Sequence, residues 1–290
     1  MRLVTVMTGA GPRACAGYAG RYVDVQRADP DLPANVRGIL ALGPAGLKRV
    51  AAALPIGPTS YDPSDCTLLA PIPDPGKIVC LGLNYRDHAR EIGADLPSEP
   101  ILFSKYASSL VGRGAAIVLP SISSEVDFEA ELVVVIGSRA KNVAVDQAMD
   151  FVGGYMVGND ISARDWQLKK PGKQWMAGKT FDTFAPTGPE LVTTDEVADP
   201  HQLRIRLRLN GATMQDSNTN ELNYRIDAIV AHCSTLFTLE PGDLIFTGTP
   251  PGVGMARTPP VWLQPGDRVE VEIDGLGTLG NQVEAEPPAA

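Results

Sequence analysis

Three acidic residues alternate with other residue types in the segment VDFEAELVVVIG, residues 126–137: Asp127, Glu129 and Glu131. If the segment is one β-strand, its two-residue period places all three carboxylates on one face. A strand whose polar end simply points at water is the alternative. Asp160 ends another strand-like run, YMVGND. Two carboxylates from the first strand and one from the second would form an oxygen cage suited to Mg²⁺ or Mn²⁺.

His88, one of three histidines in the chain, precedes Glu91 by three residues in GLNYRDHAREIG. On a helix this spacing brings both side chains onto one face, where the carboxylate can accept a hydrogen bond from the imidazole. The other ring nitrogen would then be free to take a proton from water. Gly82 and Gly93 flank the segment, as expected of a short element that moves over a site. An exposed pair on a solvated helix face is the alternative, which the spacing alone favours.

A lysine and a Gly/Pro loop could bind an anionic substrate. Lys179 lies among aromatic residues in QWMAGKTFDTFAPTGP, so its ammonium could be partly buried and hold a carboxylate or an enolate. An exposed loop lysine is the alternative. The loop IFTGTPPGVG, residues 245–254, lacks the order of a nucleotide-binding loop, which argues against phosphoryl transfer. It can present backbone N–H groups and the Thr249 hydroxyl to an anion, or serve as a structural turn.

The elements that must position these residues are mostly short apolar strands, punctuated by Gly and Pro. They predict an α+β fold that is mainly β, of the sandwich or rolled-barrel kind. Helical patterns cover residues 84–93, 145–152 and 220–237. The predicted organisation is a small N-terminal α+β domain, a proline-rich linker without regular structure, a main domain and a tail. The corresponding ranges are 1–62, 63–76, 77–284 and 285–290.

Composition excludes several classes of function. The net charge of −9 and the lack of a Lys/Arg block argue against nucleic acid as a partner. Arg204, Arg206 and Arg208 alternate with Ile and Leu, which predicts the wet face of a half-buried strand. Four widely spaced cysteines without a CxxC pair argue against disulfides and a zinc ribbon. Without a secretory signal or a long apolar run, we expect a soluble cytoplasmic protein with no membrane contact.

Five segments, taken in chain order, resemble the motifs of the fumarylacetoacetate hydrolase superfamily over about residues 70–284. They are GLNYRDHAREIG, FEAELVVVIG, GNDISARDWQ, GKTFDTFAPTGP and TGTPPGVG. The resemblance implies a mixed β-sandwich roll, a divalent metal ion (Mg²⁺ or Mn²⁺) and a homodimer. Within the superfamily, the chain most resembles the fumarylacetoacetate hydrolase domain-containing protein 2 group and the bacterial 2-hydroxyhepta-2,4-diene-1,7-dioate isomerase-like group.

The resemblance also implies roles for individual residues, while Asp127 receives none. The implied metal ligands are Glu129, Glu131 and Asp160. The implied catalytic residues are His88 and Glu91, a lid pair that activates water or shuttles a proton, and Lys179, which stabilises an oxyanion. The implied substrate-binding residues are Arg164, Gln167, Thr249 and Lys105.

Residues and resemblance together predict a metal-dependent enzyme that acts on a small oxo-acid. Our first expectation is hydrolysis of a C–C bond in a diketoacid such as an acylpyruvate, as in aromatic catabolism. The substrate would chelate the metal and form an enolate, while His88 activates the attacking water. The second is tautomerisation or decarboxylation of oxaloacetate, or isomerisation of a hydroxymuconate-type diacid. The third, a catalytically silent metabolite-binding relative, conflicts with the complete set of candidate residues.

Overall fold

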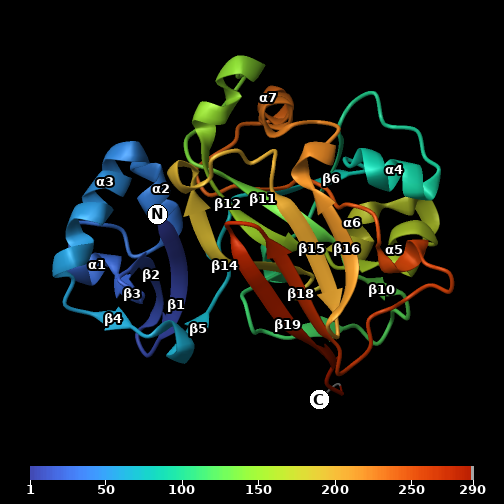
Figure 1. Cartoon of the computed structure of the whole chain (residues 1–290), viewed down its shortest axis with the longest axis horizontal. Helices are drawn as coiled ribbons and strands as arrows, with labels where there is room; N and C mark the ends of the chain where they lie inside the picture. The colour runs from blue at the N-terminus through green and yellow to red at the C-terminus, as the bar shows by residue number, and fades with distance from the viewer. Residues whose placement is uncertain (289–290) are drawn as a thin grey trace.

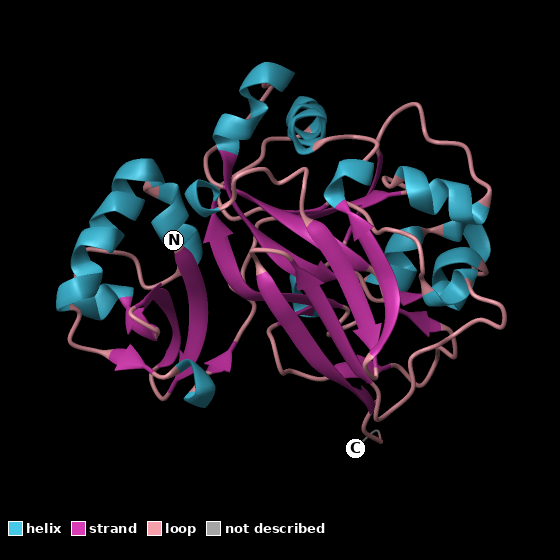
Figure 2. Cartoon of the chain, in the orientation of Figure 1, coloured by secondary structure: helices cyan, strands magenta, loops and turns pink. Residues whose placement is uncertain are grey.

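The computed structural model of the chain describes residues 1–288 and contains one large mixed sheet, a smaller sheet packed against it, and helices around both (Figures 1 and 2). The predicted α+β, mainly β class is therefore confirmed. The large sheet has twelve strands. Its main path is β4 (Ser60–Tyr61), β3 (Arg21–Asp24), β2 (Gly11–Tyr18), β1 (Arg2–Thr8), β14 (Ala185–Thr193), β12 (Val152–Asn159), β11 (Ala130–Ile136), β17 (Leu244–Phe246), β6 (Ile78–Gly82) and β7 (Ile101–Ser104).

The remaining strands complete the sheets. Beside that path, β5 (Thr67–Leu68) pairs with β1, and β8 (Leu110–Val111) pairs with β14. The smaller sheet has five strands, in the order β16 (Ala212–Asn218), β15 (Arg204–Leu209), β18 (Arg268–Ile273), β19 (Gly277–Ala285) and β9 (Ile117–Leu119). A separate pair consists of β10 (Val126–Asp127) and β13 (Ser162–Ala163).

Short helices surround the sheets. The α-helices are α1 (Val25–Ala28), α2 (Val36–Ala41), α3 (Gly43–Ala53), α4 (Arg86–Ile92), α5 (Arg164–Leu168), α6 (Trp175–Lys179) and α7 (Ile226–Leu236). The 3₁₀ turns are η1 (Leu54–Ile56), η2 (Pro63–Asp65), η3 (Ala107–Ser109), η4 (Val145–Phe151), η5 (Pro171–Lys173), η6 (Thr194–Glu196), η7 (Thr219–Glu221) and η8 (Gly254–Ala256). Among the described residues 1–288, no helix is both long and apolar enough to span a membrane.

Strand β11 is buried on both faces, so the large sheet forms the middle layer of the fold. Every residue of this strand is buried, as its nearly continuous apolar sequence requires. Leu132 and Val134 pack into the core shared with the smaller sheet. Val133 and Val135 point the other way, into a core that also contains α2 and α3. The polar residues at the start of β11 therefore lie at the edge of a rigid layer.

The N-terminal lobe is joined to the main body by sheet pairing (Figure 1). Strand β1 pairs antiparallel with β14, so the lobe extends the large sheet. The proline-rich range 63–76 was expected to lack regular structure, but it contains η2 and β5. Pro63 is compatible with this structure because it starts the 3₁₀ turn, where its missing N–H has no role.

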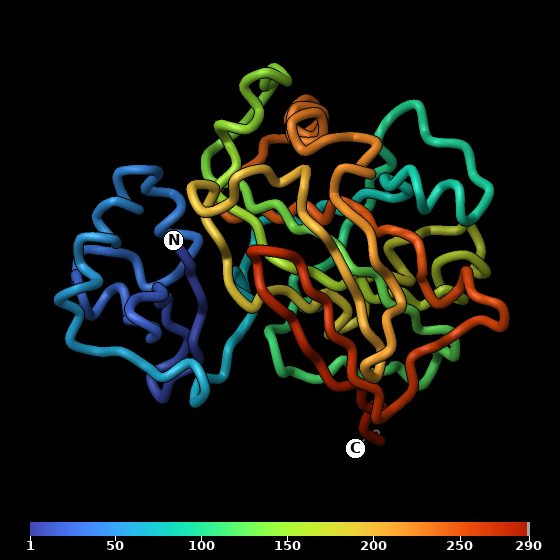
Figure 3. The backbone as a smooth tube through the Cα atoms, viewed as in Figure 1, coloured from blue at the N-terminus to red at the C-terminus, as the bar shows by residue number. Residues whose placement is uncertain are grey.

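Two of the three predicted helices are α-helices in the structure, α4 and α7, although both are shorter than predicted. The third range forms η4, which is a 3₁₀ helix. The sequence did not predict α5 and α6, which are only five residues each. On β15, the three arginines lie on the more exposed face, which confirms the half-buried strand. Helices α4, α5 and α6 gather at one end of the main body, and a long peripheral loop follows α4 (Figures 1 and 3).

Candidate active site

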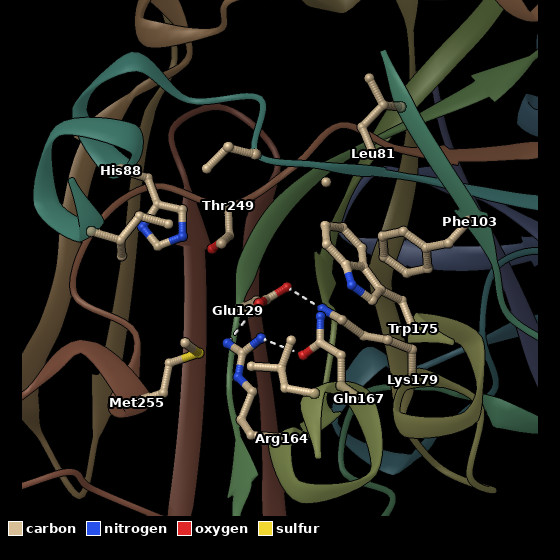
Figure 4. A pocket seen from close by; sticks show the side chains of 14 residues that line it. Leu81, His88, Phe103, Glu129, Arg164, Gln167, Trp175, Lys179, Thr249 and Met255 are labelled. Atoms are coloured by element: carbon tan, nitrogen blue, oxygen red, sulfur yellow. Dashed lines mark hydrogen bonds and ion pairs between the residues drawn. The ribbon is translucent and has the colours of Figure 1, made fainter. Parts of the chain in front are cut away.

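A cavity of about 180 Å³ lies where α4, α5 and α6 meet the end of the large sheet (Figure 4). Its polar lining consists of His88, Glu129, Arg164, Gln167, Lys179 and Thr249. Its remaining lining consists of Leu81, Gly82, Leu83, Ile92, Phe103, Leu168, Trp175 and Met255. A small cavity that combines apolar walls with a few charged groups is typical of a small-molecule site.

Glu129, Glu131 and Asp160 form a buried acidic cluster at this end of the sheet. They each offer a carboxylate oxygen within 4.8 Å of the others. Sheet pairing brings them together, because the start of β11 lies beside the end of β12, with Glu131 opposite Gly158. Just beyond the paired residues, the Asp160 N–H donates to the carbonyl oxygen of Glu129 at 2.9 Å. Regular antiparallel pairing therefore produces the cluster that the sequence predicted.

The chemistry of this cluster fits a divalent cation. Glu131 Oε2 accepts a hydrogen bond from the Gly248 N–H at 2.7 Å, whereas its buried Oε1 has no hydrogen-bond partner in residues 1–288. Burial raises the pKa of Glu131 well above its ordinary value, and the charges of Asp160 and Glu129 add to this effect. A hard cation would satisfy the orphaned oxygen and offset the repulsion among the three carboxylates. The residues present could therefore hold Mg²⁺ or Mn²⁺.

Asp127 does not belong to this cluster, which corrects the expectation that the three alternating acids share one strand face. Strand β10 ends at Asp127 and β11 begins at Ala130, so the two-residue period is interrupted between them. At this break, side-chain amide oxygens accept the backbone N–H groups that a neighbouring strand would otherwise pair. The Glu129 N–H donates to Asn159 Oδ1 at 3.0 Å, and the Ala130 N–H donates to Gln215 Oε1 at 2.8 Å.

The carboxylate of Asp127 instead joins Arg164 to the loop at η8. Arg164 Nε donates to its Oδ2 at 2.9 Å. Its oxygens also accept the N–H groups of Gly254, at 2.7 Å, and Met255, at 3.1 Å. Because Arg164 and Met255 both line the cavity, Asp127 fixes two parts of the wall without itself reaching the cavity.

Two buried cations face the acidic cluster. Lys179 Nζ lies 2.6 Å from Glu129 Oε2 and 2.9 Å from Asp160 Oδ2. Arg164 Nη2 lies 2.7 Å from Glu129 Oε1, and its Nη1 donates to Gln167 Oε1 at 2.9 Å. Burial alone would lower the pKa of Lys179, but the charges of Asp160 and Glu129 raise it above the ordinary value. The lysine is therefore a charged group inside the site, which excludes the exposed-loop alternative.

Lys105 is placed differently from its predicted role in substrate binding. Its side chain is fully buried, 2.7 Å from Asp160 Oδ1, and it does not line the cavity. Its ammonium also donates to the carbonyl oxygens of Ile161, at 3.1 Å, of Phe184, at 2.7 Å, and of Lys179. Because all these partners are protein groups, Lys105 supports Asp160 and the end of α6 from behind.

His88 and Glu91 are paired on α4, as their spacing predicted. Nδ1 of His88 lies 2.9 Å from Glu91 Oε2, and the Gly252 N–H donates to Glu91 Oε1 at 2.8 Å. An ionised carboxylate can only accept, so this contact places the imidazole proton on Nδ1. Nε2 then has no hydrogen-bond partner in the described chain, and the ring faces the cavity beside Thr249 (Figure 4). With only 9% of His88 exposed, the solvated-helix alternative is excluded.

Two buried amides that the sequence analysis missed hold the cavity loops. Gln215 Nε2 donates to Thr249 Oγ1 at 2.8 Å, so it fixes the hydroxyl that lines the cavity. Asn84 Nδ2 donates to the carbonyl oxygens of Thr247, at 2.8 Å, and Tyr224, at 3.1 Å, just before α4 begins. The sequence around neither amide predicts its role, because the partners of each lie more than thirty residues away in the chain.

The net charge of the side chains around the cavity is compatible with binding of both a cation and an anionic substrate. The buried acids are Asp127, Glu129, Glu131 and Asp160, and the buried bases are Lys105, Arg164 and Lys179. Four negative and three positive charges sum to −1 when all are ionised, and one divalent cation would bring the sum to +1. Such a site suits an anionic oxo-acid.

Several known proteins are similar to this chain in sequence and in fold. The family profile described as "Fumarylacetoacetate (FAA) hydrolase C-terminal" matches residues 77–284. Oxaloacetate tautomerase fahd2, mitochondrial, from Xenopus laevis is 48% identical over 287 residues, which cover 98% of this chain and 90% of that protein. Among solved structures, a putative HpcE protein from Mycobacterium smegmatis has a TM-score of 0.90 and 36% identity, and the match covers 99% of this chain and 100% of that one. Maleylpyruvate hydrolase from Sphingobium sp. SYK-6, solved with manganese(II) and pyruvate, has a TM-score of 0.82 and 30% identity, with the same coverages.

Proposed function

The chain belongs to the fumarylacetoacetate hydrolase family, and from this membership we propose that it is a divalent-metal-dependent oxaloacetate tautomerase. One feature of the geometry carries the proposal. The free Nε2 of His88 faces a small cavity that also exposes Lys179 and Arg164. This arrangement supplies a proton carrier on one side of a small oxo-acid and cations for its carboxylates and keto oxygen. The curated relative's tautomerase activity supports this reaction over C–C hydrolysis, which reverses the order expected from the sequence.

Tautomerisation moves one proton from C3 of oxaloacetate and places another on the C2 oxygen, or the reverse. A divalent cation held by Glu129, Glu131 and Asp160 would stabilise negative charge on the substrate's oxygens. His88 Nε2 would take or return the C3 proton. Glu91 would stabilise the imidazolium that forms, because its carboxylate already accepts the Nδ1 hydrogen bond. This contact also fixes the ring orientation, so no rearrangement of the pair is needed.

The cationic side chains would bind the substrate and assist at its oxygen. Lys179 is a charged donor next to the acidic cluster, so it would donate to the C2 oxygen as negative charge develops there. Arg164 would bind the second carboxylate, since its guanidinium lines the cavity and is held on its other side by Asp127. Apolar residues such as Leu81 and Ile92 would keep bulk water from the reacting carbon.

C–C hydrolysis is a second candidate, which the likeness to the maleylpyruvate hydrolase favours. The same imidazole would then take a proton from a water molecule, and the hydroxide would attack a carbonyl carbon. The two reactions differ in their products, since only hydrolysis releases a second acid.

Two assays on one protein preparation separate these functions. The first follows the ultraviolet absorbance of enol-oxaloacetate as it converts to the keto form, with EDTA-treated and Mn²⁺-restored protein. The second measures pyruvate release from an acylpyruvate. We expect Mn²⁺-dependent loss of the enol and little pyruvate. Rapid pyruvate release, without acceleration of the enol conversion, would contradict the proposal and support hydrolysis.

A further inference from the structure

The indole of Trp175 forms one wall of the cavity, on the side away from His88 (Figure 4). Trp175 is the first residue of α6, and Phe103 packs against its ring with centroids 5.8 Å apart and an interplanar angle of 71°. This edge-to-face contact is a favoured aromatic geometry and supports the indole from one side.

Gly82 supports the indole from another direction. A Cβ atom at this position would lie 2.1 Å from Cζ3 and 2.8 Å from Cη2 of Trp175, closer than non-bonded carbon atoms can approach. The far edge of the indole therefore rests on the backbone at the end of β6, in space that any side chain at position 82 would fill. The glycine flanking the α4 segment thus has a packing role in addition to the mobility suggested by the sequence.

The cavity that remains is small. Its volume of about 180 Å³ lies below the roughly 300–1,000 Å³ of sites for drug-sized ligands. A short oxo-diacid is compatible with this space, whereas a longer chain that extends toward Trp175 meets the indole. Removal of a large wall residue would lengthen the cavity.

We propose that Trp175, which packs against Gly82, determines substrate length and restricts the site to short 2-oxo diacids. This inference rests on the proposed function, because it assumes that the oxo-acid binds in this cavity. Trp175 acts by steric exclusion of longer substrates. A longer chain must displace an indole that is packed between Phe103 and the Gly82 backbone.

Binding of a homologous series of acids tests the proposal. Calorimetry with Mn²⁺-loaded protein would measure the affinity for oxaloacetate, 2-oxoglutarate and 2-oxoadipate, which have four, five and six carbons. We expect the wild-type affinity to fall about tenfold or more with each added methylene. In Trp175→Ala, the affinity for the six-carbon acid relative to the four-carbon acid should rise at least tenfold. Trp262→Ala, which removes a tryptophan outside the cavity lining, should keep the wild-type ratio.

A double-mutant cycle tests whether Gly82 acts through the indole. Gly82→Ala should weaken binding of all three acids, because the added methyl group displaces the ring. In the Trp175→Ala background, the same substitution should have little effect, since the methyl group then has no indole to meet. Circular dichroism would check the fold of each variant, and Trp175→Leu would replace Trp175→Ala if the latter does not fold.

The outcomes distinguish the inference from the function on which it rests. Wild-type protein that binds none of the three acids would contradict the proposed function. Wild-type protein that binds oxaloacetate, with a Trp175→Ala variant that keeps the wild-type length preference, would contradict the inference alone. Equal effects of Gly82→Ala in both backgrounds would also contradict it, because they would show that the glycine does not act through Trp175.

Discussion

The carboxylate of Asp127 holds the guanidinium of Arg164 from behind, with Oδ2 lying 2.9 Å from Nε and 2.8 Å from Nη2. Both side chains are almost completely buried. Nη2 also lies 2.7 Å from Glu129 Oε1, and Arg164 lines the cavity. An acid without an implied role in the family motifs thus positions the cation that we assign to the substrate's second carboxylate.

Removal of one partner from this buried pair should cost far more stability than removal of one partner from an exposed pair. Asp127→Ala removes one of the two carboxylates that pair with the buried guanidinium, and it leaves the N–H groups of Gly254 and Met255 without their acceptor, so we expect the free energy of unfolding to fall by about 3–5 kcal/mol. Asp216→Ala is the matched control, because it breaks the exposed Arg204–Asp216 pair and should cost less than about 1 kcal/mol. Urea denaturation measures both values. Equal losses would show that Asp127 is no more important than a surface acid.

Glu131→Gln should separate metal binding from folding. The amide keeps an oxygen that can accept from the Gly248 N–H but loses the negative charge that a cation needs. We expect at least about tenfold weaker Mn²⁺ binding by calorimetry. In EDTA the variant should be at least as stable as wild type, because the repulsion from Asp160 and Glu129 is relieved.

Glu125→Gln serves as the control for this measurement. Glu125 pairs with Lys169 outside the acidic cluster, so its substitution should leave the Mn²⁺ affinity unchanged. An unchanged affinity in Glu131→Gln as well would show that the ion binds elsewhere.

His201 should make the stability of the protein depend on pH below neutrality. Its Nε2 accepts the N–H of Ile226, the first residue of α7, at 3.1 Å. Burial lowers the pKa of His201, and the charge of Arg225 lowers it further, against the opposing effect of Asp199. The folded protein therefore binds fewer protons than the unfolded chain. The contribution of His201 to the free energy of unfolding is fully present above about pH 6.5, the ordinary histidine pKa. This contribution is lost as the pH falls toward the lowered pKa of His201.

Thermal unfolding between pH 7.5 and 5 would measure this effect by comparison with His201→Gln. The glutamine can still accept a hydrogen bond at the start of α7 but cannot titrate. The melting temperature of wild type should therefore fall more steeply with decreasing pH than that of the variant. Parallel profiles would show that another group is responsible.

Local sequence patterns predicted the parts of the site that depend on local geometry. The three-residue spacing of His88 and Glu91 predicted their pairing on a helix, and α4 provides it. The apolar run after Glu131 predicted a buried strand that begins next to acidic residues. Regular pairing with β12 then brings Asp160 to the same edge. These features follow from the periods of helices and strands, which are visible in one sequence.

Contacts between distant segments could not be predicted in this way. The strand break after Asp127 depends on Gln215 and Asn159, whose side chains replace backbone partners. Lys105 was expected to contact substrate, but its surroundings include carbonyl oxygens up to 79 residues away in the chain. The pairing of β1 with β14 joins segments nearly 190 residues apart. No periodic pattern encodes such contacts, because they depend on how complete elements pack.

The most direct test of the central claim is the exchange of the C3 protons of oxaloacetate in D₂O, followed by NMR with Mn²⁺-loaded protein. We expect wild-type protein to accelerate exchange well above the rate in buffer with Mn²⁺ alone. His88→Gln should be slower by about 10²–10⁴-fold, as for loss of a general acid–base group, while it binds Mn²⁺ normally by calorimetry. Exchange at the wild-type rate in His88→Gln would contradict proton transfer by His88. Absence of any acceleration by the wild-type protein would contradict the tautomerase itself.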